Sequence, residues 1–238
     1  MTILGYKTKV ESVAIAGAQD FVLRTLLDRQ QFHDPEGVAQ RRGISSATWP
    51  LFGLLWPSGI HLAAHLARRP VCPHERILEI GCGLGLASLV GHKRGARITA
   101  SDRHPLTEVF LDHNARLNDL SLLKYRHGQW GADAEEIELE DDIAVLSGRY
   151  DLIIGSDLLY ERDAPEALAA FIDQHAEAAA EAWIVDPNRG HRAAFNRHMA
   201  AYGFTLEDDV RLNEPPIGYG RPGSYKGRLL AYRRRISG

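Results

Sequence analysis

The segment that most constrains the fold is an apolar run that passes through an acidic residue into a glycine-rich loop. It reads Ile77-Leu-Glu79-Ile-Gly81-Cys-Gly83-Leu-Gly85-Leu-Ala-Ser-Leu. Glycines at alternate positions permit turns with positive φ, and they leave no side chain between the backbone N–H groups and a ligand. The segment therefore predicts a strand, a loop and a helix, with a ligand bound at the loop.

A second apolar run, Ile98-Thr-Ala-Ser-Asp102, places a carboxylate 21 residues after Gly81. A carboxylate at a strand end can accept hydrogen bonds from both hydroxyls of a ribose. A dinucleotide-binding loop has the spacing G-x-G-x-x-G, which sets a helix N-terminus against a pyrophosphate. Here the spacing is G-x-G-x-G, and the sixth position is Leu86. The two runs together predict a nucleoside ligand that has no pyrophosphate to be neutralised.

This loop, with Glu79 two residues ahead of it, resembles the cofactor loop of the class I, seven-stranded S-adenosylmethionine-dependent methyltransferases. The resemblance implies that Glu79 supports the loop and the methionine end of the cofactor. It also implies S-adenosylmethionine as the cofactor, without a metal. The other residues of these two runs that we expect in the cofactor site are Gly81, Cys82, Gly83, Gly85, Asp102 and Arg103.

Composition and charge agree with an ordinary enzyme domain. Of the 238 residues, 45% are hydrophobic and 25% are charged, which is enough to form a core without a disulfide or a metal. The formal net charge of −3 gives no general attraction to nucleic acid or to a membrane. The chain has two cysteines, no signal-peptide pattern and no apolar run long enough to span a membrane. We therefore expect a soluble, cytoplasmic protein.

Strands and helices are expected to alternate along the chain. The expected helices are residues 57–69, 84–94, 105–117, 164–180 and 191–202, and the expected strands of the main sheet are residues 76–80, 97–101, 122–129, 150–155, 182–185, 204–212 and 226–233. Residues 7–15 and 21–27 predict a hairpin. The pattern predicts an α/β, Rossmann-like, doubly wound seven-stranded sheet with helices on both faces. Residues 1–48 would form an N-terminal β-hairpin extension, and residues 49–238 the methyltransferase domain.

The segment after the fourth strand, Gly155-Ser-Asp-Leu-Leu-Tyr160, carries the main clue to the chemistry. Ligands gather at the carboxyl ends of the strands in open α/β sheets, so we expect Ser156, Asp157 and Tyr160 to face the cofactor. Methyltransferases that act on adenine or glutamine have two prolines in this turn, and this chain has none. The segment instead resembles the Asp-x-x-Tyr signature of a group of protein-lysine methyltransferases. This group is similar to methyltransferase family 16.

Two tryptophan segments match the same group. Leu55-Trp56-Pro57-Ser58-Gly59 resembles the segment that leads into the first helix and covers the cofactor. Trp130-Gly131 resembles the tryptophan whose ring lies on the adenine. Beyond Tyr160, only Asp186-Pro-Asn-Arg189 is similar to the branch that modifies the electron transfer flavoprotein. The N-terminal hairpin and residues 213–224 are where we expect the substrate to be chosen.

A lysine acceptor has to lose a proton before it can take a methyl group, because its ordinary pKa is about 10.4. We expect Asp157 to orient the amine, and Tyr160 and Trp56 to desolvate it and so lower its pKa. Asp157 and Tyr160 are the expected catalytic residues. Purely structural roles remain open: Asp157 could cap a helix, and the rings of Tyr160, Trp56 and Trp130 could simply pack in the core.

Three functions remain open at this point. The chain could N-methylate a protein side chain, lysine before histidine; it could methylate a small amine or heterocycle; or it could bind the cofactor without catalysis. RNA methylation is disfavoured by the net charge and by the missing prolines. Metal sites are disfavoured as well. No carboxylate lies between His61 and His65, and the acidic segment 131–147, which we expect to be a surface helix or excursion, has no histidine.

Overall fold

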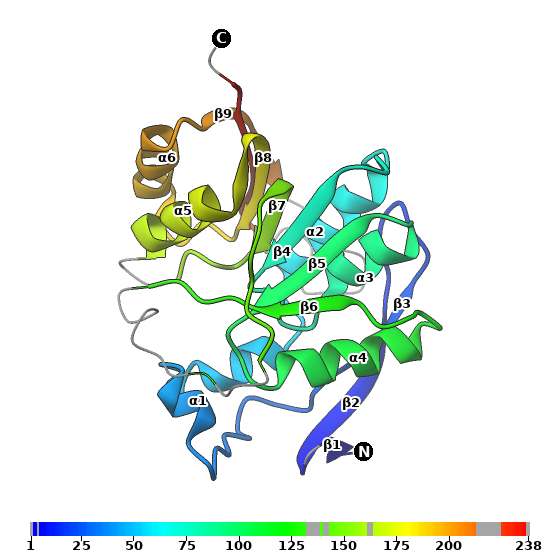
Figure 1. The fold of residues 1–238 in the computed structure, drawn as a ribbon. Coiled ribbons are helices and arrows are strands. Elements are labelled where there is room, and N and C mark those ends of the chain that lie inside the picture. Colours follow the sequence, from blue (N-terminus) through cyan, green and yellow to red (C-terminus); the bar gives the residue numbers. More distant parts are fainter. Residues whose placement is uncertain are drawn as a thin grey trace.

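The computed structural model describes residues 2–3, 5–131, 139, 143–160, 164–212 and 225–236. Its centre is a seven-stranded sheet with the order β6-β5-β4-β7-β8-β10-β9 (Figure 1). The strands are β4 (Arg76–Ile80), β5 (Arg97–Asp102), β6 (Lys124–His127), β7 (Tyr150–Ser156), β8 (Ala176–Asp186), β9 (Thr205–Leu212) and β10 (Gly227–Arg234). β10 runs antiparallel to β8 and β9, and the other pairs are parallel. The expected seven-stranded α/β fold is confirmed.

Helices cover both faces of the sheet (Figure 1). One face carries α2 (Pro57–Arg68), α3 (Leu86–Lys93) and α4 (Thr107–Leu117), and the other carries α5 (Ala164–His175) and α6 (Arg192–Ala201). Successive residues of a strand point to opposite faces. In β4, Ile77 accordingly packs in the first core and Leu78 in the second. Because both faces are buried, the central strands are continuous apolar runs rather than alternating ones.

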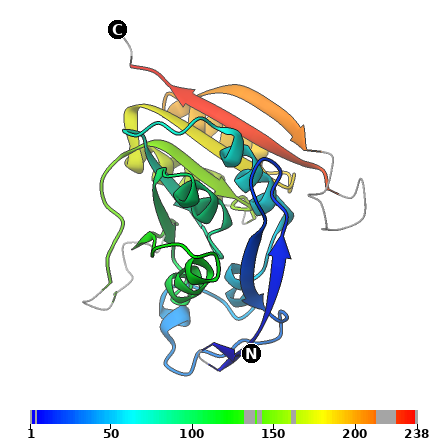
Figure 2. The same cartoon turned by 90° about the vertical axis from the view of Figure 1, so that its right-hand side faces the viewer.

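The expected N-terminal hairpin is present, as part of a three-stranded sheet of β1 (Thr2–Ile3), β2 (Tyr6–Val13) and β3 (Phe21–Leu26). The hairpin lies beside α4 (Figure 2). The side chain of Asn118 accepts a hydrogen bond from the Val22 N–H and donates one to the Val22 carbonyl, both at 2.8 Å. Asn114 Oδ1 accepts from the Arg24 N–H at 2.7 Å. After the hairpin the chain forms α1 (Val38–Arg41) and the short 3₁₀ helix η1 (Trp49–Gly53).

One expected boundary is wrong. The helix expected over residues 164–180 ends at His175, and Ala176–Ala180 begin β8. Alanine favours helix by intrinsic propensity, but tertiary pairing overrides such preferences. Ala176 pairs with Tyr150 of β7, and Ala180 pairs with Arg234 of β10. The acidic segment 131–147, which we expected to be a surface helix or excursion, lies mostly outside the described residues. The expected loop 213–224 lies wholly outside them.

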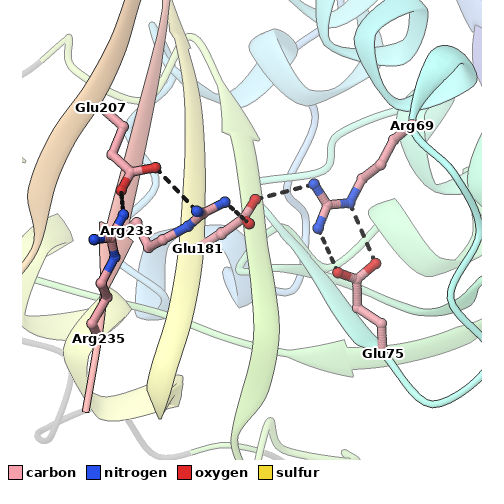
Figure 3. Close-up of polar contacts among 6 residues, drawn as sticks. All are labelled: Arg69, Glu75, Glu181, Glu207, Arg233 and Arg235. Atoms are coloured by element: carbon pink, nitrogen blue, oxygen red, sulfur yellow. Dashed lines mark hydrogen bonds and ion pairs between the residues drawn. The ribbon is translucent and has the colours of Figure 1, made fainter. Parts of the chain in front are cut away.

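An ion-pair network crosses the edge of the sheet at the amino ends of the parallel strands (Figure 3). Glu181 of β8 accepts from Arg69 at 3.0 Å and from Arg233 at 2.6 Å. The network continues through Glu75 on one side and through Glu207 and Arg235 on the other. The basic C-terminal strand is therefore neutralised within the fold. Among the described residues, none of the helices has both the length and the apolar character that a membrane span requires.

Candidate active site

A cavity of about 350 Å³ opens at the carboxyl ends of β4, β5 and β7. This is the place where open α/β sheets bind their ligands. Most of the residues expected from the sequence line this one cavity, and they come from five separate stretches of the chain: Trp56, Glu79, Gly81, Cys82, Gly83, Asp102, Arg103, Trp130, Ser156, Asp157 and Tyr160. Gly85 is the one expected residue that does not line it.

The glycine loop has the positive φ angles that its sequence predicts. They are +57° at Gly81, +51° at Gly83 and +71° at Gly85. At Gly81 a Cβ would lie 2.4 Å from Leu158 and 3.4 Å from the ring of Trp130. Gly85 is the N-cap of α3, and its Cβ would lie 2.3 Å from Leu111 Cδ1. Gly81 therefore lets the cavity wall close over the loop, whereas Gly85 starts the helix and lets α4 pack against it.

Glu79 holds the loop to the first turn of α3. Its side chain is buried, and Oε2 accepts hydrogen bonds from both the N–H and the hydroxyl of Ser88, the former at 2.7 Å. Burial raises the pKa of Glu79 to about 7; the two bonds from Ser88 oppose this rise, and the charge of Asp102 adds to it. The carboxyl group is therefore close to half-ionised near neutral pH, and a cation in the cavity would favour its charged form.

Asp102 fixes the far side of the loop. Oδ2 accepts from the Gly83 N–H and Oδ1 from the His104 N–H, both at 2.8 Å. Burial raises the pKa of Asp102, while these backbone bonds and the charge of Arg103 lower it. Since each carboxylate oxygen has two lone pairs, both oxygens can still accept a further hydrogen bond from a ligand.

His104 also lines the cavity and lies stacked on Phe52, with ring centroids 3.7 Å apart. Burial, helped by the charges of Arg42 and Arg103, lowers the pKa of His104 to about 3, so the ring is neutral at physiological pH. Cys82 lies beside Asp102, and its thiol pKa is raised by burial and by the neighbouring carboxylates. Neither side chain contributes charge to the cavity wall.

Two tryptophans, Trp56 and Trp130, line the cavity. Trp56 is the N-cap residue of α2, and its indole N–H donates to the Leu51 carbonyl at 2.9 Å. The guanidinium of Arg29 lies 5.1 Å from the centre of the Trp56 ring. Trp130 packs against Phe171 at a centroid distance of 5.2 Å. Both rings line the cavity as well as packing against neighbouring residues, so the expected binding role is compatible with a packing role.

Asp157 is held in an unusual backbone conformation, with φ of +59°. Its N–H donates to the Val185 carbonyl at 3.0 Å. Oδ2 is buried, and Oδ1 accepts from Arg189 at 3.3 Å. Burial raises the pKa of Asp157, and the Ser58 hydroxyl and the Arg189 guanidinium lower it. Such strained residues persist where the surroundings enforce them, which is common at functional sites.

The sequence missed several residues of this site. Arg29 and Arg189 line the cavity, whereas Tyr225 does not; the Tyr225 hydroxyl lies 2.6 Å from Ser58 Oγ, and burial raises the pKa of Tyr225. Arg29 and Tyr225 come from opposite ends of the chain and carry no local sequence signal. Arg189 follows β8 at its carboxyl end, so the same rule that predicted Asp157 could have placed it.

The N-terminal extension contributes to the cavity through residues that follow the hairpin. The described residues before α2 that line it are Arg29, Ile44, Thr48, Leu51, Phe52, Leu54, Leu55 and Trp56. The two hairpin strands instead pack on α4. The strands of the hairpin are thus not among the described residues that line the cavity, and its expected part in choosing the substrate stays a prediction.

Comparison with known proteins finds a matching family and similar methyltransferases. A family described as lysine methyltransferase matches residues 50–196. The zebrafish electron transfer flavoprotein beta subunit lysine methyltransferase is 27% identical over 173 residues, which are 68% of this chain and 60% of that protein. The protein N-lysine methyltransferase METTL21A of Xenopus tropicalis is 29% identical over 133 residues, which are 52% of this chain and 57% of that protein. The chain thus spans less than two thirds of the length of these relatives.

The fold recurs among solved structures. The crystal structure of the ribosomal protein L11 methylase from Lactobacillus delbrueckii subsp. bulgaricus superposes with a TM-score of 0.58 at 16% identity, covering 97% of this chain and 100% of that one. The magnesium protoporphyrin IX methyltransferase of Synechocystis, with bound S-adenosylmethionine, superposes with a TM-score of 0.53 at 16% identity. The match covers 87% of this chain and 88% of that one. These likenesses concern the fold. The family match extends over more than half of the chain, and this protein therefore belongs to the lysine methyltransferase family.

Proposed function

We propose that this chain is an S-adenosylmethionine-dependent methyltransferase that N-methylates a lysine side chain of a protein. The observation that carries the proposal is the placement of Asp157 and Tyr160 in the same cavity as the glycine loop and Asp102. The proposed acceptor site and the proposed nucleoside site would thus share one cavity. The relatives named above act, by their names, on lysine in proteins, which supports the same acceptor here.

The cavity residues fit the cofactor. Asp102 would accept the ribose hydroxyls through its remaining lone pairs, and Trp130 would stack on the adenine, which adds about 1 kcal/mol beyond area burial. Glu79 would accept from the amino group of the methionine end, and that charge would keep its carboxylate ionised. When bound, S-adenosylmethionine supplies the methyl group. The proposed reaction requires no metal.

The residues around Asp157 would prepare the acceptor. Asp157 accepts a hydrogen bond from the lysine ammonium and so fixes the direction of its nitrogen. Tyr160 and Trp56 desolvate the ammonium as it enters the cavity, which lowers its pKa, so the proton passes to solvent before entry is complete. The neutral amine keeps one N–H bond to Asp157 and points its lone pair toward the cofactor side of the cavity. Positioning of this kind accounts for most of the rate in an in-line transfer.

We propose further that the chain works as one unit, with residues 1–48 as an extension of the catalytic domain 49–238. The hydrogen bonds from the hairpin to Asn114 and Asn118 support this. A protein partner rather than a nucleic acid is supported by the net charge of −3. The free thiols of Cys72 and Cys82 suit a reducing compartment, so we place the protein in the cytoplasm.

The test uses S-adenosylmethionine that carries a tritiated methyl group, with lysate of the source organism lacking this gene. Wild-type protein should label one discrete polypeptide, at lysine. Asp157→Asn should bind the cofactor with unchanged Kd but label nothing, because the amide no longer attracts the ammonium. Asp102→Ala should lose cofactor binding.

Each other outcome contradicts the proposal in a distinct way. Label confined to the small-molecule fraction would point to a small-amine methyltransferase. Tight cofactor binding without any transfer would point to a non-catalytic binding protein. Full activity of Asp157→Asn would refute the amine-orienting role.

A further inference from the structure

Three arginines surround the proposed acceptor position. Each lies beside one of the side chains that form this position, which are Asp157, Tyr160 and Trp56. We call Arg29, Arg103 and Arg189 the cavity arginines, since all three line the cavity. They come from the N-terminal extension, from the residue after β5 and from the loop after β8. Segments distant in sequence thus converge to place positive charge around one point.

The distances tie each arginine to one acceptor-site side chain. An Nη atom of Arg189 lies 3.3 Å from Asp157 Oδ1, and an Nη atom of Arg103 lies 3.5 Å from Tyr160 Oη. Arg29 lies over the ring of Trp56 at 5.1 Å. An amine that enters between Asp157, Tyr160 and Trp56 therefore meets a guanidinium group on each side.

The cavity arginines differ from other arginines of the chain in how they are neutralised. Each of the following forms an ion pair with a carboxylate of the fold: Arg69, Arg76, Arg228, Arg233, Arg234 and Arg235. Within the described part of the chain, Arg29 and Arg103 lie within ion-pair distance of no carboxylate. The single ion-pair partner of Arg189 there is Asp157, the group that the acceptor amine is proposed to use.

The acidic side chains among the described lining residues offset this charge only in part: Asp157 pairs with Arg189, and Asp102 lies in the field of Arg103. Glu79 is buried under the loop with its pKa raised toward neutral, and Asp102 is buried with both oxygens bonded to backbone N–H groups. Arg29 and Arg189 are exposed. Among the described residues, the exposed charged side chains that line the cavity are therefore the two arginines Arg29 and Arg189, although the whole chain has a net charge of −3.

Exposed arginines at the cavity select among lysine-containing segments. Neighbouring cations favour the neutral form of an entering amine, which is the reactive form. They repel a segment rich in lysine or arginine and attract a segment rich in aspartate or glutamate. When the amine takes Asp157 Oδ1, Arg189 loses its partner, and a carboxylate of the incoming segment can replace it.

We propose that the acceptor lysine lies in an acidic segment of its protein, and that Arg29 and Arg189, together with Arg103, bind the carboxylates flanking that lysine. The inference rests on the proposed function, since it names the substrate class of the same site. Arg103 is also expected to contact the cofactor, so the test depends on Arg29 and Arg189.

The test measures binding separately from catalysis. Two fluorescent peptides of equal length carry one central lysine, flanked either by aspartate and glutamate or by arginine. Fluorescence anisotropy is measured with the protein loaded with S-adenosylhomocysteine. The acidic peptide should bind about tenfold more tightly or better, and the preference should shrink as salt is added.

Variants of Arg29 and Arg189 test whether these arginines cause the preference for the acidic peptide. Arg29→Gln and Arg189→Gln should each reduce it, and the double variant should abolish it, with the Kd for S-adenosylhomocysteine unchanged. Arg116→Gln is the matched control, because Arg116 is an exposed arginine in the last turn of α4, at the opposite edge of the sheet. It should keep the full preference.

The inference is overturned if the arginine-flanked peptide binds equally or better, if the acidic peptide does not bind, or if the double variant keeps the preference. A weaker Kd for S-adenosylhomocysteine in Arg29→Gln and Arg189→Gln would overturn it too, by making these residues part of the cofactor site. Methylation is scored separately. Arginine-dependent binding of the acidic peptide without methyl transfer to any protein refutes the proposed function alone, whereas transfer to a lysine in a basic segment refutes this inference alone.

Discussion

Replacement of Glu79 by glutamine should stabilise the cofactor-free protein above neutral pH while weakening cofactor binding. The carboxyl group is buried and accepts both of its hydrogen bonds from Ser88 through one oxygen. A glutamine carbonyl can accept the same two bonds, and its amide cannot ionise. The substitution thus removes the charge and keeps the connection between β4 and α3.

The magnitude follows from the difference between the folded and unfolded pKa of Glu79. Burial raises the pKa from 4.5 to about 7. Below pH 4.5 the group is protonated in both states and has no effect. As pH rises from 4.5 to 7, the unfolded chain releases a proton that the folded chain keeps, so the free energy of unfolding falls by up to about 1.4 kcal/mol per pH unit. Above pH 7 the total loss levels off at about 3 kcal/mol.

Urea unfolding without cofactor, measured from pH 5 to pH 8, tests this reasoning. Glu79→Gln should be more stable than wild type by about 1 kcal/mol at pH 5 and by about 3 kcal/mol at pH 8. The control Glu36→Gln removes the charge of an exposed glutamate and should follow wild type throughout. Calorimetric titration should show weaker S-adenosylmethionine binding by Glu79→Gln alone. A variant less stable than wild type at pH 8, or a difference that does not grow with pH, would refute the argument.

Two further substitutions probe the packing that shapes the site. Gly85→Ala should lower the free energy of unfolding by about 2–4 kcal/mol, because φ is +71° and the Cβ would lie 2.3 Å from Leu111. Gly43→Ala, with φ of +67° and open space around its Cβ, should show only the backbone cost of about 1 kcal/mol in the same urea titration. Asn118→Ala removes both hydrogen bonds to Val22 and should cost about 2–3 kcal/mol, with faster amide exchange in β3; unchanged exchange there would mean that other contacts hold the hairpin.

The sequence by itself determined the sheet and its ligand-binding edge. The run from Ile77 to Gly85 encodes a buried strand followed by a loop of positive φ, and the structure has both. Asp102 was located by its spacing from Gly81, because one strand–helix–strand unit has a nearly fixed length. Such features depend on residues close together in the chain, so their periodicity and spacing are enough to predict them. The roles assigned to Asp157 and Tyr160 stay predictions.

Local preference failed where distant strands decided the outcome. Residues 176–180 favour helix by composition but form β8, because β7 and β10 offer hydrogen-bond partners there. Gly85 belongs to the loop motif in sequence, yet it faces Leu111 rather than the cavity. No short stretch of the sequence contains both residues 176–180 and the strands that pair with them, or both Gly85 and Leu111.

Only the tertiary structure decided what surrounds the acceptor position. Arg29 and Arg189 are 160 residues apart in the chain, and packing alone brings them to the same cavity as Asp157. The near-neutral pKa of Glu79 is likewise a property of burial, which no single segment specifies. Spacing along the chain predicts where backbone turns and strand ends fall, whereas charge and ionisation depend on which distant side chains exclude water from one another.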